Sequence, residues 1–206
     1  MRFIVNILAI VGLITIIGIG VGYSKINGML LEAGMSINDV KNLMSELDPK
    51  AMETYADFAK KFMENKDPGD AMVWKFPVDE DVSVEDVKDS LKSLATDRNF
   101  LFVGESPFYK QVEAVTGNPY RHVSFLSFCD VGVGVQMADY NDAYTAFMPC
   151  RISVVEDKQG KLWLYSMNLD LMIYGGKELP PKLKAGAIKV RDTIVAIMES
   201  ASHGEF

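Results

Sequence analysis

Residues 150–167 read CRISVVEDKQGKLWLYSM, and this stretch carries the clearest secondary-structure pattern in the chain. Two runs rich in β-branched, aromatic and other apolar residues, 150–156 and 161–167, flank the turn sequence Asp-Lys-Gln-Gly. Gly160 suits the left-handed backbone position that such a turn requires. The pattern therefore predicts a β-hairpin, in which two neighbouring strands run antiparallel.

Further strands and helices are predicted on both sides of this hairpin. Short apolar runs predict strands at residues 71–78, 100–104 and 122–129. Helical patterns begin at the capping residue Ser83 and cover residues 109–115, 136–146 and 183–199. This interrupted order predicts a single α+β domain with a mixed or antiparallel sheet of about five strands, packed by helices.

The first two dozen residues have a different character. Residues 3–22 form an uncharged apolar run of about twenty residues, long enough to cross a bilayer as a helix. A cleaved signal peptide is the alternative, but its apolar region would be shorter and a small-x-small cleavage site would follow. We therefore expect an uncleaved transmembrane anchor at residues 1–23. A short anchor before a large domain favours a periplasmic or extracellular location for that domain.

A helical stalk is expected between the anchor and the domain, at residues 24–70. Ser36 and Asp39 have the spacing of a capping box, and Asp48-Pro49 is a typical start for a second helix. The turn sequence Lys-Asp-Pro-Gly-Asp ends this region. The α+β domain is therefore predicted to cover residues 71–206.

The charge of the chain limits its partners. The 206 residues carry a formal net charge of −7, without a run of Lys or Arg. An acidic domain repels phosphate backbones, so we expect no nucleic-acid partner. The same charge disfavours adsorption to anionic lipid, so attachment to a membrane depends on the apolar segment.

The sequence contains no complete catalytic motif. The loop DVGVGVQ, which begins at Asp130, follows a predicted strand, but it lacks the third glycine of a dinucleotide-binding loop and the lysine of a phosphate loop. Its glycines are therefore interpreted as turn residues. The carboxylates Glu105, Asp130 and Glu156 are candidates for acid–base chemistry that nothing in the sequence brings together. We therefore assign no catalytic residue and do not favour an enzyme.

A haem site is an open alternative. With two histidines in the chain, His122 and His203, neither a Ser-His-Asp triad nor a multi-histidine metal site is favoured. His122 could be an axial haem ligand, with Met137, Met148 or Met167 as its partner. The competing interpretation is an ordinary histidine at the start of a strand.

The two cysteines are the most informative pair of residues. Cys129 ends the third predicted strand, and Cys150 begins the fourth. If these strands are antiparallel, both sulfurs lie at the same end of the sheet, and a disulfide, a metal or a redox role is feasible. If the intervening helix makes a parallel crossover, the sulfurs lie at opposite ends. Cys129, Cys150 and His122 are the candidate cofactor-binding residues, whereas buried cysteines acting as small apolar groups are the alternative.

Three segments of the chain together resemble the domain-of-unknown-function family 302. They are HVSFLSFCD, FMPCRISVVED and KLWLYSMN. Cys129 matches the first motif cysteine of that family, and Pro149 and Cys150 match its second motif. The sequence departs from the family at Asp130, where asparagine is usual, and in the glycine-rich insert that follows. The resemblance implies a compact, dimeric α+β fold over residues 80–200, and it implies no activity.

These observations predict a membrane-anchored, extracytoplasmic binding or redox-accessory domain that forms a homodimer. A haem- or metal-binding protein is one alternative. The other is a structural subunit of a membrane complex, in which Gly18 and Gly22 of the anchor and the helices of residues 36–65 contact a partner.

Overall fold

The computed structural model describes residues 22, 24–25, 27–32 and 34–206. The chain divides into two compact units at Leu47, and each is considered by itself below. No helix among the described residues has the length and apolarity needed to cross a membrane. The predicted anchor at residues 1–23, apart from Gly22, lies outside the described residues, and so does Gly18.

The first unit contains the predicted capped helix. Helix α2 (Ile37–Glu46) begins after Ser36, whose hydroxyl accepts the Asp39 N–H at 3.2 Å while the Asp39 carboxylate accepts the Ser36 N–H at 2.7 Å. This is the predicted capping box. Residues 27–32 are helical where a connector was expected, because Met, Leu and Glu predominate there and favour a helix.

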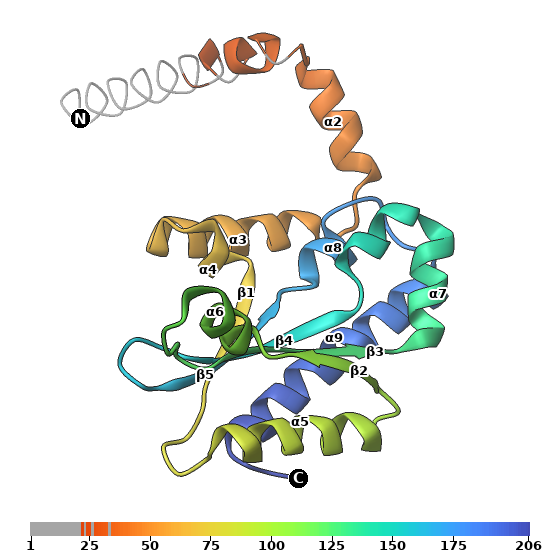
Figure 1. Cartoon of the computed structure of the whole chain (residues 1–206). Helices are drawn as coiled ribbons and strands as arrows, with labels where there is room; N and C mark the ends of the chain where they lie inside the picture. The colour runs from red at the N-terminus through yellow and green to blue at the C-terminus, as the bar shows by residue number, and fades with distance from the viewer. Residues whose placement is uncertain (1–21, 23, 26, 33) are drawn as a thin grey trace, which may run out of the picture. The chain divides into compact units, whose positions relative to one another are not determined.

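The second unit contains a five-stranded sheet that is antiparallel throughout (Figure 1), so the prediction of an α+β domain with about five strands is confirmed. The strand order in the sheet is β1-β5-β4-β3-β2. The strands are β1 (Val73–Pro77), β2 (Leu101–Ser106), β3 (Val123–Cys129), β4 (Cys150–Glu156) and β5 (Leu162–Met167).

The β4–β5 hairpin forms as the sequence predicts. Asp157 at its turn accepts the N–H groups of Gln159 at 2.8 Å and Lys161 at 2.9 Å, and its other carboxylate oxygen accepts the indole N–H of Trp163 at 2.8 Å. Gly160 has a φ of +81°, the left-handed conformation that glycine adopts without steric cost. One carboxylate therefore fixes both the turn and the first aromatic residue of β5.

Two long helices cover one face of the sheet and form the main core (Figure 1). They are α5 (Val84–Asp97) and α9 (Pro181–Ser202), which also pack against each other. The short helix α6 (Phe108–Thr116) packs against β3, and the rings of Phe108 and Phe125 are 5.8 Å apart. The sheet contributes Leu126, Phe128, Ile152, Val154 and Leu164 to the core, and the helices contribute Val87, Leu91, Ile194, Ile197 and Met198.

The remaining helices correct two sequence-based expectations. Helices α3 (Ala51–Asn65) and α4 (Pro68–Ala71) were expected in a stalk at residues 24–70, but they belong to the second unit. Helix α3 packs against α8 (Asp170–Tyr174), and the Tyr55 hydroxyl donates a hydrogen bond to the Gly175 carbonyl at 2.6 Å. The helical region predicted as one stalk is therefore divided at Leu47.

The second correction concerns the glycine-rich segment after β3. It was expected as a loop before a helix at residues 136–146. Instead, helix α7 (Val131–Tyr140) begins directly after Asp130, and a 3₁₀ helix, η1 (Asp142–Phe147), follows it. The Asp130 side chain accepts the Val133 N–H at 3.1 Å, and this cap starts the helix before the glycines. Helix α8 was not expected, because it is only one turn long.

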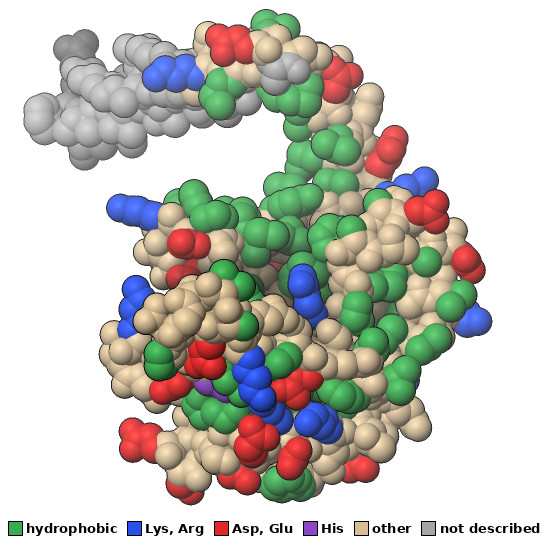
Figure 2. Space-filling view, in the orientation of Figure 1, with side chains coloured by type: hydrophobic (Ala, Val, Ile, Leu, Met, Phe, Trp, Pro, Cys, Tyr) green, Lys and Arg blue, Asp and Glu red, His purple; other side chains and the backbone are tan. Residues whose placement is uncertain are grey.

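On the face of the second unit that Figure 2 shows, Lys and Arg side chains are interspersed with Asp and Glu side chains. The negative net charge of the chain is therefore not collected in one part of that face.

Candidate functional site

Strand register brings the two cysteines to one end of the sheet. Strands β3 and β4 are antiparallel, and Phe128 is paired with Cys150, so Cys129 and Cys150 lie at the same end of the sheet. The segment between them, which contains α7 and η1, therefore connects two antiparallel strands at the same end of the sheet and is not a parallel crossover. Both cysteines are free thiols.

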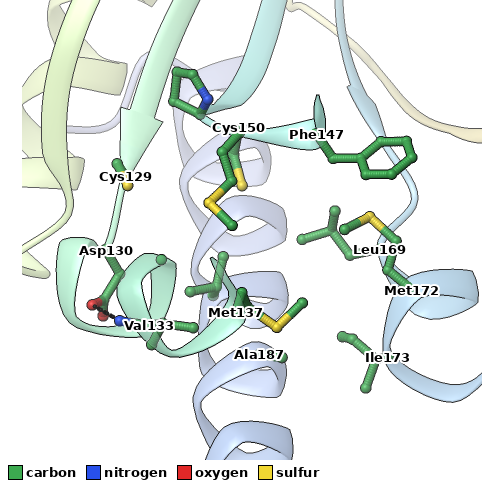
Figure 3. A pocket seen from close by; sticks show the side chains of 14 residues that line it. Cys129, Asp130, Val133, Met137, Phe147, Cys150, Leu169, Met172, Ile173 and Ala187 are labelled. Carbon is green, nitrogen blue, oxygen red and sulfur yellow. Dashed lines mark hydrogen bonds between the residues drawn. The ribbon is translucent and has the colours of Figure 1, made fainter. Parts of the chain in front are cut away.

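A small apolar cavity lies at this end of the sheet (Figure 3), and we call it the sulfur pocket. Its volume is about 70 Å³. The two cysteines and three methionines bring five sulfur atoms to its wall. The sulfur-containing lining residues are Cys129, Met137, Met148, Cys150 and Met172, and the apolar ones include Val133, Phe147, Leu169, Ile173 and Ala187.

Two glycines lie at the contacts that helix α7 makes with this wall and with helix α9. A Cβ atom added at Gly134 would lie 3.5 Å from the Cys129 sulfur and 3.6 Å from the Met148 sulfur. At Gly186 of α9, an added Cβ would lie 3.0 Å from a methyl carbon of Val133. Gly132 and Gly134 both lie within helix α7, so their interpretation as turn residues is wrong. At Gly134 a methyl group would make ordinary van der Waals contacts with the two sulfurs.

Asp130 is the charged residue that lines the pocket, and its charge is already engaged. One carboxylate oxygen accepts the Val133 N–H, and the other lies 3.3 Å from the ammonium group of Lys189 on α9. The carboxylate therefore serves as a helix cap and an ion-pair partner, and the cavity itself is lined mainly by neutral groups.

Burial keeps both thiols protonated at neutral pH. It raises the pKa of Cys150 to about 11, and the neighbouring Cys129 contributes further to this increase. Burial also raises the pKa of Cys129, and the negative charge of Asp130 adds to the effect. Because the thiolate is the nucleophilic form, these thiols are weak nucleophiles. Apart from Asp130, the pocket wall is accordingly neutral and polarisable.

His122 does not join this site. It precedes the first residue of β3, whereas Cys129 is the last, so the two lie at opposite ends of a strand roughly 20 Å long. The His122 ring nitrogen Nε2 is 2.9 Å from the Ser124 hydroxyl, and its ring is 4.7 Å from the ring of Tyr109. Burial and the positive charge of Lys88 lower the pKa of His122.

The same register separates His122 from the methionines proposed as its haem partners. Met137 and Met148 line the sulfur pocket, and Met167 is at the end of β5, opposite Val73. All three therefore lie towards the cysteine end of the sheet. The described residues do not bring together the axial pair that a haem held by His122 would require.

The candidate carboxylates are also separated. Glu105 lies 2.9 Å from the buried ammonium group of Lys88, and Glu156 accepts the His122 N–H at 3.1 Å, both away from Asp130. Within the part of the chain that the structure describes, no group of three or more His, Cys, Asp or Glu side chains is placed to hold a metal ion. Glu105, Asp130 and Glu156 are therefore engaged at separate places and do not form an acid–base pair with one another.

The methionines of the pocket are the site residues that the sequence analysis missed as a group. Met137 and Met148 were considered only as haem ligands, and Met172 was not considered. The tripeptide Met148-Pro149-Cys150 was a usable signal, because it places a thioether beside a thiol at the start of a strand.

The fold and the site define an antiparallel α+β domain with a sulfur-lined cavity beside the junction of two central strands. The family model described as "Domain of unknown function DUF302" matches residues 74–201, more than half of the chain, and the chain belongs to this family. The predicted family resemblance is therefore confirmed.

A solved structure shares this fold. It is described as "Crystal structure of uncharacterized conserved protein DUF302 from Bacillus stearothermophilus", and it is similar to this chain with a TM-score of 0.51 and 13% sequence identity. The match covers 62% of this chain and 95% of that chain. Comparison with the curated proteins finds no match.

Proposed function

We propose that this protein is a membrane-tethered domain that binds a small ligand in the sulfur pocket. The single observation that carries the proposal is the cavity itself, which is lined by thioethers, protonated thiols and apolar side chains. Binding sites are typically concave and mainly apolar, with few polar groups. Cys129 and Cys150 remain the candidate binding residues, and His122 is no longer one of them.

Binding is favoured over a redox role for an electrostatic reason. Redox-active cysteines have lowered pKa values and a substantial thiolate fraction. Burial instead raises the pKa of both pocket thiols, and the structure contains them as free thiols. A buried, protonated pair is better suited to contact a ligand than to exchange electrons with a partner.

The binding proposal predicts that xenon enters the sulfur pocket, since apolar protein cavities bind this gas. With ¹³C-methyl methionine labelling of the full chain in detergent, xenon pressure should shift the methyl resonances of Met137, Met148 and Met172. Gly134→Ala should abolish these shifts, because Gly134 lines the pocket and the new methyl group would occupy space 3.5 and 3.6 Å from the two nearest sulfurs without a steric clash.

Gly132→Ala is the matched control. It makes the same change in the same helix, but its Cβ would face Asp130 rather than the two sulfurs. Met63, which is 69% exposed, reports non-specific exposure to the gas. Equal shifts at Met63 and at the pocket methionines, or full shifts in Gly134→Ala, would contradict the proposal.

The tether is proposed from the apolar run at residues 3–22. We propose a periplasmic or extracellular location for the domain, because a short N-terminal anchor before a large domain commonly exports that domain. We expect the full chain to stay in the membrane pellet after alkaline carbonate extraction. A chain beginning at Ser24 should move to the supernatant, because the apolar segment that holds the protein in the bilayer is gone. Complete extraction of the full chain by carbonate would argue against the tether.

We also propose a homodimer, which the family resemblance implies. The second candidate role, as a structural subunit of a membrane complex, is favoured by the G-x-x-x-G pair of Gly18 and Gly22, a pattern that allows close helix packing in membranes.

A further inference from the structure

The sulfur pocket collects its sulfur atoms from several separate elements. Cys129 comes from the end of β3, Met137 from α7, Met148 from the end of η1, Cys150 from the start of β4, and Met172 from α8. Methionines are common in ordinary cores, where they contact carbon atoms on all sides. Here the thioethers and thiols instead share one cavity, and it is this convergence that points to a ligand.

The geometry brings a thiol and a thioether within reach of one another. The sulfurs of Cys129 and Met148 lie 3.5 and 3.6 Å from the same point beside Gly134, so they are at most 7.1 Å apart, the sum of these distances. Cys150 is paired with Phe128, the residue before Cys129, and its side chain lines the same cavity as that of Cys129. Figure 3 shows Cys129 and Cys150 at the ends of two neighbouring strands, with α7 and Met137 below them in this view. The unbranched side chain of Met148 can rotate to close the remaining gap.

The chemistry of this donor set selects a particular class of ion. Thiolate and thioether ligands are soft and favour Cu(I), whereas imidazole and carboxylate ligands suit harder or borderline cations. Neither His122 nor His203 lines the pocket, and Asp130 is held by its helix cap and by Lys189. The lining therefore offers sulfur to a cation and little else.

We infer that the sulfur pocket binds one Cu(I) ion through the sulfurs of Cys129 and Cys150 and the thioether of Met148. This inference rests on the proposed function, in which the pocket is the ligand site, and it names the ligand class. A thiol that coordinates the ion releases its proton to solvent, and copper remains Cu(I) throughout. Met137 and Met172 complete the apolar wall that shields the ion from water.

Competition with a coloured chelator tests the inference. The full chain in detergent is titrated anaerobically with Cu(I), kept reduced by ascorbate, against bathocuproine disulfonate. We expect the chain to withdraw one equivalent of copper per chain. Cys129→Ser and Met148→Leu should each lower the affinity at least about tenfold, because even the loss of an outer contact at a metal site costs that much.

Met148→Leu keeps the size and apolar character of the side chain and removes only the sulfur, so the fold should be preserved. Met63→Leu makes the same exchange at an exposed position on α3 and should leave the affinity unchanged. Unchanged tryptophan fluorescence spectra show that each variant is folded. X-ray absorption of the copper-loaded protein should show sulfur neighbours alone.

Two results would overturn the copper assignment: a chain that takes no copper from the chelator, or equal affinities in the wild type, Cys129→Ser and Met148→Leu. The xenon experiment separates this failure from failure of the proposed function. Xenon-dependent shifts at the pocket methionines without copper binding would leave a pocket for apolar ligands and remove the ion. Loss of both would remove the pocket as a binding site.

Discussion

Replacing Phe128 with alanine is expected to destabilise the domain by about 3–5 kcal/mol, the usual cost of truncating a large aromatic residue in a core. Phe128 is fully buried in β3, and its ring centroid lies 6.1 Å from that of Phe100 and 5.6 Å from that of Phe102. The variant would lose contacts with both rings and leave a cavity beneath α5 and α9. Urea unfolding followed by the fluorescence of Trp74 and Trp163 measures the change.

Phe206→Ala is the matched control, because it removes the same side chain at a position that is 67% exposed. Surface substitutions of this kind usually change the free energy of unfolding by less than about 0.5 kcal/mol. If Phe128→Ala and Phe206→Ala had similar effects, the packing of β3 against the two helices described above would be incorrect.

Asp48→Ala should be nearly as damaging, because it removes one partner of a buried ion pair. The Asp48 side chain is fully buried, and its carboxylate lies 2.5 Å from the ammonium group of Lys184 on α9 and accepts the Lys50 N–H at 2.9 Å. We expect a loss of about 3 kcal/mol, at the low end of the range for broken buried pairs, because Lys184 keeps Glu178 as a partner at 2.7 Å. The same urea titration measures it.

The stability that Asp48 contributes should depend on pH. Burial raises the pKa of the Asp48 carboxyl. The hydrogen bonds from Lys184 and Lys50 and the charges of these lysines lower this pKa by a larger amount, so the net pKa is below its usual value of 3.8. A lowered folded-state pKa gives stability that is present above the unfolded value and is lost as the pH falls through the folded value. The difference between the wild type and Asp48→Ala should therefore shrink below about pH 4.

Asp57→Ala provides the comparison for this ion pair. Asp57 pairs with Lys61 at 2.8 Å on the surface of α3, with 54% of its side chain exposed. Exposed pairs of this kind contribute about 0.3–0.5 kcal/mol. A pH-independent effect of Asp48→Ala, or an effect no larger than that of Asp57→Ala, would show that the buried pair does not stabilise the domain.

The local parts of the fold were predictable because their causes are local. The hairpin follows from two apolar runs around a turn, and the helix after Ser83 follows from a capping box that the structure contains. The direction of β3 relative to β4 was not predictable, because it depends on how the twenty residues between Cys129 and Cys150 fold back. Sequence patterns alone allowed both a return and a crossover.

The candidate site was predicted in part for the same reason. Cys129 and Cys150 stood out as strand-end residues, but their shared cavity depends on Ala187 and Met172, which approach from distant parts of the chain. The position of Gly134 beside the pocket was also not predictable, because one of the sulfurs next to it belongs to Met148, fourteen residues later in the sequence. His122 was correctly predicted at the start of a strand. Only the strand register shows that this position lies at the opposite end of the sheet from the two cysteines.

Helix α9 serves the cavity and the core with one continuous element. Ala187 and Val190 line the sulfur pocket, whereas Ile194 and Ile197 fill the core beneath the sheet. Inserting one residue between Val190 and Ile194 would rotate one set by about 100° relative to the other. We therefore expect the length of this stretch to be constrained, and changes in ligand preference to arise by side-chain exchange rather than by insertion or deletion.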